Sequence, residues 1–233
     1  MKVKIFADGA NLSDMLAYYG SGGVVSGFTT NPTLMRKAGI SDYEAFAKEV
    51  LASIPDLPVS FEVFSDELPE MEKQARKIAS WGANVYVKIP VTNTRGMFTD
   101  PILQTLSSTG VKINVTAVFT IAQVKEVVKN LSSETPSIIS IFAGRIANAG
   151  VDPMPIMKRA VELAKPLPKC EILWASPREA LNVVQAEECG CHIITMTPDI
   201  LATLKTFGKD LHQYSLETVQ MFYRDAQSAG YTL

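Results

Sequence analysis

Asp8, Glu62 and Lys88 are ionisable residues that each lie at or beside the carboxyl end of a short apolar segment. A lysine that is flanked by apolar residues and turned into a protein interior loses hydration, which disfavours its ammonium form. A neutral amine can attack a carbonyl carbon and form a Schiff base. The alternative for Lys88 is a phosphate-binding or solvent-reaching lysine, and its strand, taken alone, favours that alternative.

The polar groups expected near Lys88 favour the Schiff-base interpretation of this lysine. A carboxylate near an amine and a hydroxyl, here Glu62 and Thr116, can hold a water and move the protons that imine chemistry needs. The alternative for Glu62 is a buried ion pair with Lys88, and both interpretations can hold in a resting enzyme. Asp8 could accept a hydroxyl proton when a carbon–carbon bond breaks, or it could cap a helix that begins near Asn11.

Later segments could bind an anion. Ser176-Pro177-Arg178-Glu179 has the form of a capping box with proline in the first helical turn, and such a helix start with an arginine suits a phosphate. Gly144-Arg145 offers a second guanidinium. Asn31-Pro32 has the form of another helix start, with Asn31 as the N-cap.

Eight apolar segments, separated by amphipathic stretches such as Leu68–Ser80, recur along the chain. This alternation is typical of a parallel sheet covered on both faces. No linker divides the chain, and eight units of roughly 29 residues suit one (β/α)8 TIM barrel. The alternative is an open doubly wound sheet, but Gly20-Ser21-Gly22-Gly23 precedes a strand instead of following one. The expected strands are Val3–Asp8, Val24–Thr29, Val59–Val63, Asn84–Ile89, Val111–Thr116, Ser137–Phe142, Glu171–Ser176 and His192–Thr195.

Alternation within the strands predicts which side chains face the inside of the barrel. Residues two apart share a face, and barrel active sites form at the carboxyl ends of strands. We expect these strand-end residues to share one mouth: Asp8, Asn31, Glu62, Lys88, Thr116, Ser140, Ser176 and Thr195. In the seventh strand the same alternation, counted back from Ser176, places Ile172 and Trp174 on the inner face.

A further helix over Ser215–Ser228 exceeds what a minimal barrel needs. Ser215 is its expected cap, and its apolar side carries Leu216, Val219, Phe222 and Tyr223. We therefore expect a catalytic barrel over residues 1–214 and a helix with its tail over 215–233. That helix could fold over its own barrel or dock on a neighbouring subunit.

Composition excludes several classes of protein. The 233 residues are 47% hydrophobic and 20% charged, which is not the composition of a disordered chain. A net charge of −2 argues against nucleic-acid and membrane-surface partners.

Cysteine and histidine usage supports no metal site. His192 and His212 share no ligand spacing with the three cysteines, whose odd count fits a reducing compartment. The first segment reaches Asp8 before a signal-peptide core could form, and no apolar run approaches the roughly 18 residues of a membrane span. We expect a soluble cytoplasmic protein without metal.

Several motifs together resemble the transaldolase family, in the expected order from Asp8 to about residue 225. They are Gly27-Phe28-Thr29-Thr30-Asn31-Pro32, Val87-Lys88-Ile89-Pro90, Asn114-Val115-Thr116, Ser140-Ile141-Phe142-Ala143-Gly144-Arg145-Ile146 and Ala175-Ser176-Pro177-Arg178. The resemblance implies an (α/β)8 barrel with the Schiff-base lysine, Lys88, on its fourth strand. The chain is similar in length to the compact branch, which also contains fructose-6-phosphate aldolases that release free dihydroxyacetone. Trp174 and Ile141 depart from the small residue and the proline that are more usual in the family.

The resemblance implies transfer of a dihydroxyacetone unit from fructose 6-phosphate or sedoheptulose 7-phosphate to erythrose 4-phosphate or glyceraldehyde 3-phosphate, without a cofactor. Lys88 would form the imine, Glu62 with a water on Thr116 would move protons, and Asp8 would accept the C4 hydroxyl proton. The implied substrate-binding residues are Asn31, Thr29, Ser140, Phe142, Arg145, Ser176 and Arg178. Glu62, Ser140 and Phe142 resemble transaldolases, since the aldolases tend to have Gln, Ala and Tyr there.

Two further expectations follow from the resemblance. The compact members form rings of five, often paired into decamers, so we expect a homo-oligomer with the last helix in the contact. A fructose-6-phosphate aldolase remains one alternative, and a non-catalytic barrel that binds sugar phosphates is an alternative of another class.

Overall fold

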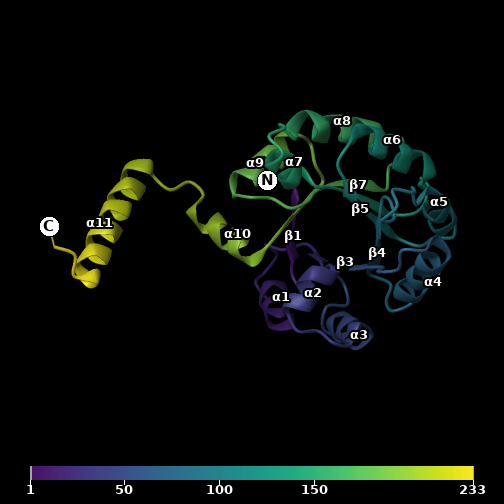
Figure 1. Ribbon diagram of the computed structural model, residues 1–233, viewed down its shortest axis with the longest axis horizontal. Helices are drawn as coiled ribbons and strands as arrows, with labels where there is room; N and C mark the ends of the chain where they lie inside the picture. The colour runs from purple at the N-terminus through teal and green to yellow at the C-terminus, as the bar shows by residue number, and fades with distance from the viewer. Residues whose placement is uncertain (1, 233) are drawn as a thin grey trace. The chain divides into compact units, whose positions relative to one another are not determined.

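The computed structural model describes residues 2–232. Within that range eight parallel strands close into a barrel in sequence order, with β8 paired to β1 (Figure 1). The closed barrel confirms the expected (β/α)8 fold and rejects the open sheet. The strands are β1 (Lys4–Asp8), β2 (Phe28–Thr29), β3 (Val59–Glu62), β4 (Val85–Pro90), β5 (Ile113–Val118), β6 (Ser137–Ile141), β7 (Cys170–Trp174) and β8 (Ile193–Met196).

The helices that alternate with the strands surround them in Figure 1. They are α1 (Leu12–Tyr19), α2 (Pro32–Lys37), α3 (Tyr43–Ser53), α4 (Leu68–Ala79), α5 (Asp100–Ser108), α6 (Ile121–Asn130), α7 (Ala143–Asn148), α8 (Met154–Ala164) and α9 (Leu181–Glu188). After β8 the chain forms α10 (Pro198–Thr203), a short 3₁₀ helix at Leu204–Thr206 and α11 (Leu211–Ala229). α4 is amphipathic, as the sequence pattern predicts. Met71, Ala75 and Ile78, at helical spacing, are buried, while Glu72 forms an ion pair with Arg76 on the outer side.

The barrel interior is closed by a cluster of buried apolar side chains. Phe6, Ile138, Leu173, Ala175 and Ile193 form this cluster. A second apolar layer lies between strands and helices, where Val87, Ile89, Val115 and Ile139 are fully buried. The side of the strands that faces the helices is therefore almost entirely apolar, whereas the inner side of β3 and β5 carries polar residues such as Ser60 and Asn114.

The expectation that Ile172 and Trp174 of β7 face the inside of the barrel is wrong. Leu173 lies in register with Ser140 and with Ile193, whereas Trp174 lies beside Ile141 and Ile194. Register partners in neighbouring strands share a face, so Leu173 and Ala175 point into the barrel and Trp174 points towards the helices. Alternation stops after the strand because Ser176 adopts a left-handed backbone with φ of 60°.

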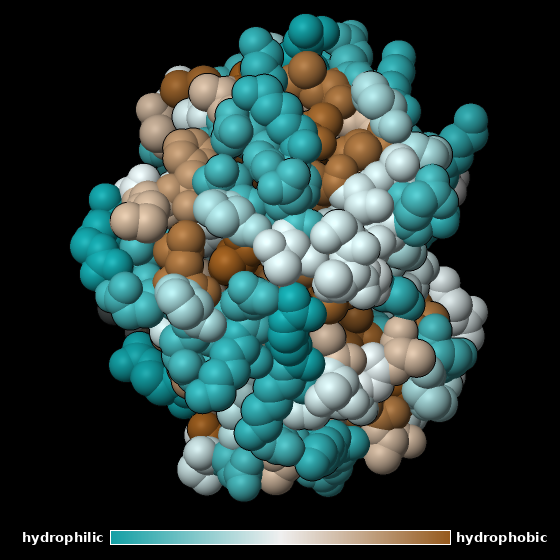
Figure 2. Space-filling model, turned by 90° about the vertical axis from the view of Figure 1, so that its right-hand side faces the viewer, coloured by the Kyte–Doolittle hydropathy of each residue, from teal (hydrophilic) through white to brown (hydrophobic). Residues whose placement is uncertain are grey.

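The outer face of the barrel carries mixed side chains. Figure 2 shows the side formed by α4, α5, α6 and α8, where apolar residues lie in small groups between hydrophilic ones. Among the described residues, no helix combines the length and the apolar character that crossing a membrane requires.

Residue contacts divide the chain into one compact unit up to Leu201 and a second from Ala202 onward. The helix of the second unit, α11, begins one turn earlier than expected, at Leu211 instead of Ser215. Asp210 has an extended backbone and its carboxylate accepts from Gln213 N at 2.9 Å, so Asp210 is the N-cap and Ser215 lies inside the helix. Lys209 pairs with Glu217 within the same unit.

Candidate active site

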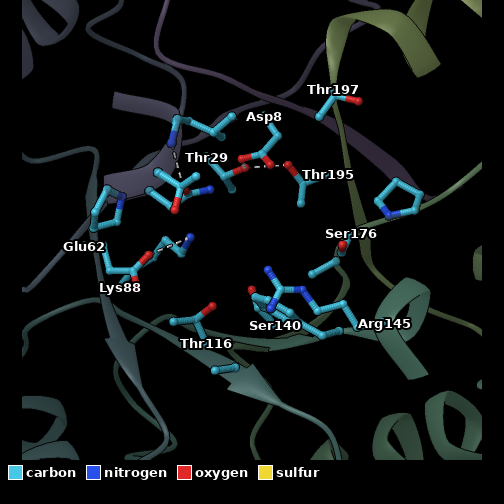
Figure 3. Close-up of a pocket in the computed structure, with 18 of the residues that line it drawn as sticks. Asp8, Thr29, Glu62, Lys88, Thr116, Ser140, Arg145, Ser176, Thr195 and Thr197 are labelled. Atoms are coloured by element: carbon cyan, nitrogen blue, oxygen red, sulfur yellow. Dashed lines mark hydrogen bonds and ion pairs between the residues drawn. The ribbon is translucent and has the colours of Figure 1, made fainter. Parts of the chain in front are cut away.

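A cavity of about 710 Å³ opens at the carboxyl ends of the strands. The eleven residues expected to act in catalysis or substrate binding all line it, as does Thr195, and Figure 3 shows Lys88 and Glu62 on one side and Arg145 and Ser176 on the other. Parallel strands bring these side chains together because every strand ends at the same mouth.

Lys88 lies at the centre of this arrangement. It is in register with Glu62 on the adjacent strand, and Lys88 Nζ lies 3.1 Å from Glu62 Oε2. Lys88 Nζ also donates to the carbonyl of Thr30 at 2.8 Å. The lysine is only 6% exposed, so the amine is held inside the cavity by two oxygen partners and does not reach bulk solvent.

Asp8 lies on β1 in a hydroxyl-rich corner. The Thr29 hydroxyl donates to Asp8 Oδ1 at 2.6 Å, and the Thr29 and Thr195 hydroxyl oxygens are 2.5 Å apart. Burial raises the pKa of the Asp8 carboxyl above its usual value, and the charge of Lys88 and the Thr29 hydrogen bond only partly oppose this. A carboxylate with a raised pKa is a better proton acceptor than an ordinary one. Asp8 does not cap the following helix, since Asn11 Oδ1 accepts from Asp14 N.

Thr116 presents a free hydroxyl to the cavity. Among the described residues its Oγ1 is buried without a hydrogen-bond partner, although buried hydroxyls are normally paired. Next to it, Ala117 has a left-handed backbone with φ of 57°, and the pairing of β5 with β6 shifts between Val115 and Val118. Such a bulge redirects side chains at the end of a strand.

A buried hydrogen-bond chain crosses the barrel below the mouth. Asn114 Nδ2 donates to Ser60 Oγ at 3.0 Å, and the Ser140 hydroxyl donates to Asn114 Oδ1 at 2.6 Å. The chain links β3, β5 and β6 and fixes the orientation of Ser140. We did not select Asn114 or Ser60 as site residues, although the alternation in their strands placed both on the inner face.

Arg145 supplies one positive charge on the side of the cavity away from Glu62. Its guanidinium lies 5.1 Å from the centre of the Phe142 ring, which itself contacts Phe119. This stacking holds the guanidinium in place without a carboxylate partner among the described residues. Arg145 is therefore free to bind an anion.

The loop after β7 supplies Ser176 and Arg178, but it is not the expected capping box. α9 begins at Leu181, and Asn182 Oδ1 accepts from Arg178 N at 2.7 Å and from Glu179 N at 3.3 Å. The left-handed backbone of Ser176 turns the chain away from a helical start, and α9 begins without a side-chain cap, while Asn182 from within the helix orients the loop. Arg178 Nε donates to Asn148 at 3.1 Å, which orients its guanidinium.

Asn31 caps α2 as expected, with its Oδ1 accepting from Leu34 N at 2.9 Å and Pro32 in the first turn. The side-chain amide group remains for a ligand, because it takes no part in the cap. Lys37 and Asp199 also line the cavity, and we did not select them from the sequence. Both lie on helices that follow strands, where no alternation marks the inward positions.

The described residues contain no cluster of histidine, cysteine, aspartate or glutamate that could hold a metal ion. The cysteines lie outside the cavity. Burial raises the pKa of the Cys170 thiol to about 11, so it is a structural residue and not a nucleophile.

The structure is a (β/α)8 barrel whose cavity contains the buried Lys88 beside the carboxylates of Glu62 and Asp8, with two arginines, Arg145 and Arg178, in its lining. Residues 5–233 match the transaldolase/fructose-6-phosphate aldolase family. The chain therefore belongs to that family, as the motifs indicated, and it is a transaldolase-type enzyme.

Similar proteins carry consistent names. A probable transaldolase of Dehalococcoides mccartyi is 37% identical over 200 residues, covering 85% of this chain and 88% of the relative. A probable transaldolase of Streptococcus agalactiae is 33% identical over 227 residues, covering 97% and 98%. The crystal structure of KGPDC from Streptococcus mutans matches with a TM-score of 0.58 at 9% identity, over 86% of this chain and 90% of that one, which shows a shared fold alone.

Proposed function

We propose that this protein is a transaldolase that moves a dihydroxyacetone unit from a ketose phosphate to an aldose phosphate through a Schiff base on Lys88. The observation that carries the proposal is the buried Lys88 amine, 3.1 Å from the Glu62 carboxylate, in a cavity with guanidinium groups on its other side. An amine, a proton-transfer group and a phosphate clamp are what a phosphorylated ketose requires.

Imine formation begins when the Lys88 nitrogen, as a free amine, attacks the C2 carbonyl of the ketose. The carbonyl oxygen takes a proton and the carbinolamine then loses water to give an iminium ion. Glu62 moves these protons through a water held by the free Thr116 hydroxyl. The unpaired state of that hydroxyl supports this role, because a buried hydroxyl without a protein partner suits a water or a substrate.

Bond cleavage uses Asp8. The Asp8 carboxylate accepts the C4 hydroxyl proton, the C3–C4 bond breaks, and its electron pair moves towards the iminium nitrogen to form an enamine. The departing fragment is an aldose phosphate. The enamine adds to a second aldose phosphate by the same steps in reverse, and hydrolysis of the new iminium ion frees Lys88. The pKa of Asp8, which burial raises, suits this proton transfer.

The two ends of the substrate occupy different sides of the cavity. Asn31 and Ser140 hold the hydroxyls of the retained three-carbon unit beside Lys88, with Thr29 orienting Asp8. Arg145, Ser176 and Arg178 bind the phosphate. Binding energy from the phosphate then aligns C2 with the amine.

Transfer is favoured over release of dihydroxyacetone because Phe142 lines the cavity without a hydroxyl. A tyrosine there could order a water against the imine and promote its hydrolysis. We also propose a homo-oligomer, since Val219, Phe222 and Tyr223 on α11 expose large apolar surfaces.

The decisive experiment is reductive trapping of the imine. Borohydride with fructose 6-phosphate should add a reduced three-carbon unit to the peptide that contains Lys88, and Lys88→Ala should lose both the label and the activity. Lys112→Ala is the matched control, because Lys112 lies outside the cavity and its Nζ donates to the Ala83 carbonyl. Labelling of another lysine, or none in the active wild type, would refute the mechanism.

Measuring the consumption of fructose 6-phosphate with and without an acceptor, alongside the trapping, separates the alternatives. A fructose-6-phosphate aldolase would be trapped on Lys88 but would consume fructose 6-phosphate without an acceptor. A non-catalytic barrel would bind the sugar phosphate with no label and no turnover, and its binding would survive the loss of Lys88.

A further inference from the structure

We propose that Tyr43, which lies outside the cavity, is a positioning residue that sets both Glu62 and Lys88 in their reactive geometry. The inference rests on the proposed function, because it concerns the two groups that carry the imine chemistry. It starts from a break in the hydrogen bonding between β2 and β3.

The pairing of β2 with β3 is regular up to Thr30. Phe28 N donates to the Pro58 carbonyl at 2.8 Å and Thr30 N donates to the Ser60 carbonyl at 3.1 Å. In a parallel ladder the next bond would run from Glu62 N to the Thr30 carbonyl. Glu62 N instead donates to the Tyr43 hydroxyl at 2.7 Å.

Tyr43 satisfies both backbone groups of Glu62, since its hydroxyl also donates to the Glu62 carbonyl at 2.8 Å. One hydroxyl thus takes the place of a missing strand residue at the end of β3. The carboxylate of Glu62 is then held on a fixed backbone, 3.1 Å from Lys88 Nζ.

The exchange of hydrogen-bond partners at Glu62 N also affects Lys88. The Thr30 carbonyl, which the ladder would have given to Glu62 N, accepts from Lys88 Nζ at 2.8 Å. Tyr43 therefore leaves one of the oxygen partners of the lysine available to it. Glu62 and Lys88 are both set by one hydroxyl that does not line the cavity.

Tyr43 is itself held firmly. It is the first residue of α3, where Asp42 caps the helix by accepting from Ala45 N at 2.9 Å. Its ring packs edge-on against Phe61 and Phe64, with centroids 6.3 and 5.7 Å away. Burial raises the pKa of the Tyr43 hydroxyl, so it remains protonated and can both donate and accept.

Tyr43→Phe tests the inference because it keeps the ring and removes the hydroxyl. Glu62 N–H would then compete with Lys88 Nζ for the Thr30 carbonyl. We expect kcat to fall by about tenfold to a hundredfold, as for other small misplacements of reacting groups, with KM changed by less than about threefold. The rate of borohydride trapping should fall in parallel with kcat.

Tyr19→Phe is the matched control. The Tyr19 hydroxyl donates to Asp56 at 2.6 Å, so the same chemical change removes a comparable bond outside the cavity. We expect that variant to keep the kcat of the wild type. Equal losses in the two variants, or an unchanged kcat in Tyr43→Phe, would overturn the inference.

A double-mutant cycle distinguishes positioning from a general loss of structure. If Tyr43 acts through Glu62, then Tyr43→Phe should cost much less in a Glu62→Gln background than in the wild type. Full additivity of the two losses would count against the inference.

A crystal structure of Tyr43→Phe keeps the inference testable if the wild type lacks transaldolase activity, an outcome that would defeat the proposed function alone. A bond from Glu62 N to the Thr30 carbonyl, with Lys88 Nζ displaced, would support the positioning role. Unchanged positions of Glu62 and Lys88 would refute it.

Discussion

The contact between Gly144 and the loop after β7 leaves no room for a methyl group. A Cβ at Gly144 would lie 1.6 Å from the Ser176 carbonyl oxygen and 2.7 Å from its carbonyl carbon. A carbon and an oxygen in contact are usually about 3.3 Å apart, so Gly144→Ala must displace the Ser176 carbonyl by roughly 1.7 Å. Ser176 already occupies the left-handed region with φ of 60°, so its backbone has few other conformations to adopt.

The size of this displacement determines how much stability and activity Gly144→Ala should lose. Overpacking of this kind costs about 1–3 kcal/mol of folding free energy. A shift of more than 1 Å in Ser176, and with it Arg178, should lower kcat/KM for phosphorylated substrates about 100-fold. Lys88 and Glu62 lie on β4 and β3, away from this loop, so borohydride trapping of unphosphorylated dihydroxyacetone should change by less than about threefold.

Gly20→Ala is the matched control, since its Cβ would meet only the Leu16 carbonyl at 3.4 Å, an ordinary contact, at a backbone φ of −75°. Kinetics with phosphorylated substrates, dihydroxyacetone trapping and urea unfolding should be compared for both variants. If Gly144→Ala keeps kcat/KM for the phosphorylated substrates, the phosphate does not bind at this loop. If trapping with dihydroxyacetone falls equally, the damage is general and the assignment of Ser176 to the phosphate end is wrong.

Three other predictions concern Asp8, Phe142 and the C-terminal helix. Burial raises the pKa of Asp8, so the folded state binds the carboxyl proton of Asp8 more tightly than the unfolded chain does. The contribution of Asp8 to the free energy of unfolding is therefore lost as pH rises through the pKa of the folded state. Asp8→Asn should therefore abolish transfer yet raise the unfolding midpoint at pH 7, and this gain should disappear below the ordinary value of 3.8; a lower midpoint at pH 7 would contradict it. Phe142→Tyr should increase the release of free dihydroxyacetone from fructose 6-phosphate without an acceptor, and an unchanged ratio of release to transfer would count against that role. Deleting residues 209–233 removes α11 from its true start and should yield a monomeric barrel in light scattering, whereas an intact chain that is already a 25.4 kDa monomer would disprove the homo-oligomer.

Strand alternation was sufficient to predict most of the cavity. In β3, β4 and β5 a polar residue at the carboxyl end shares the face of an inner residue two positions earlier, and these pairs are Ser60 with Glu62, Tyr86 with Lys88, and Asn114 with Thr116. A period of two fixes the inward side once one residue is placed, and the parallel fold then brings all the strand ends together.

Hydrogen bonds between distant segments could not be predicted in this way. The hydroxyl of Tyr43 contacts the backbone of Glu62 because the fold places the first residue of α3 beside the last residue of β3. Ala117 gives no sign of its left-handed backbone, since alanine has no preference for that region. Such features depend on tertiary packing that neither residue type nor spacing records.

The seventh strand shows why the phase of a doubly buried strand is hard to predict. Ile172, Leu173 and Trp174 are all apolar, so their pattern contains no alternation, and Ser176 alone suggested the inward side. Ser176 lies beyond the strand and has a left-handed backbone, so residues two positions before it do not share its face. The correction has a functional consequence for Trp174. The indole is 1% exposed, points towards the helices and does not line the cavity, so this departure from the family pattern affects the packing of helices on the barrel and not the shape of the cavity.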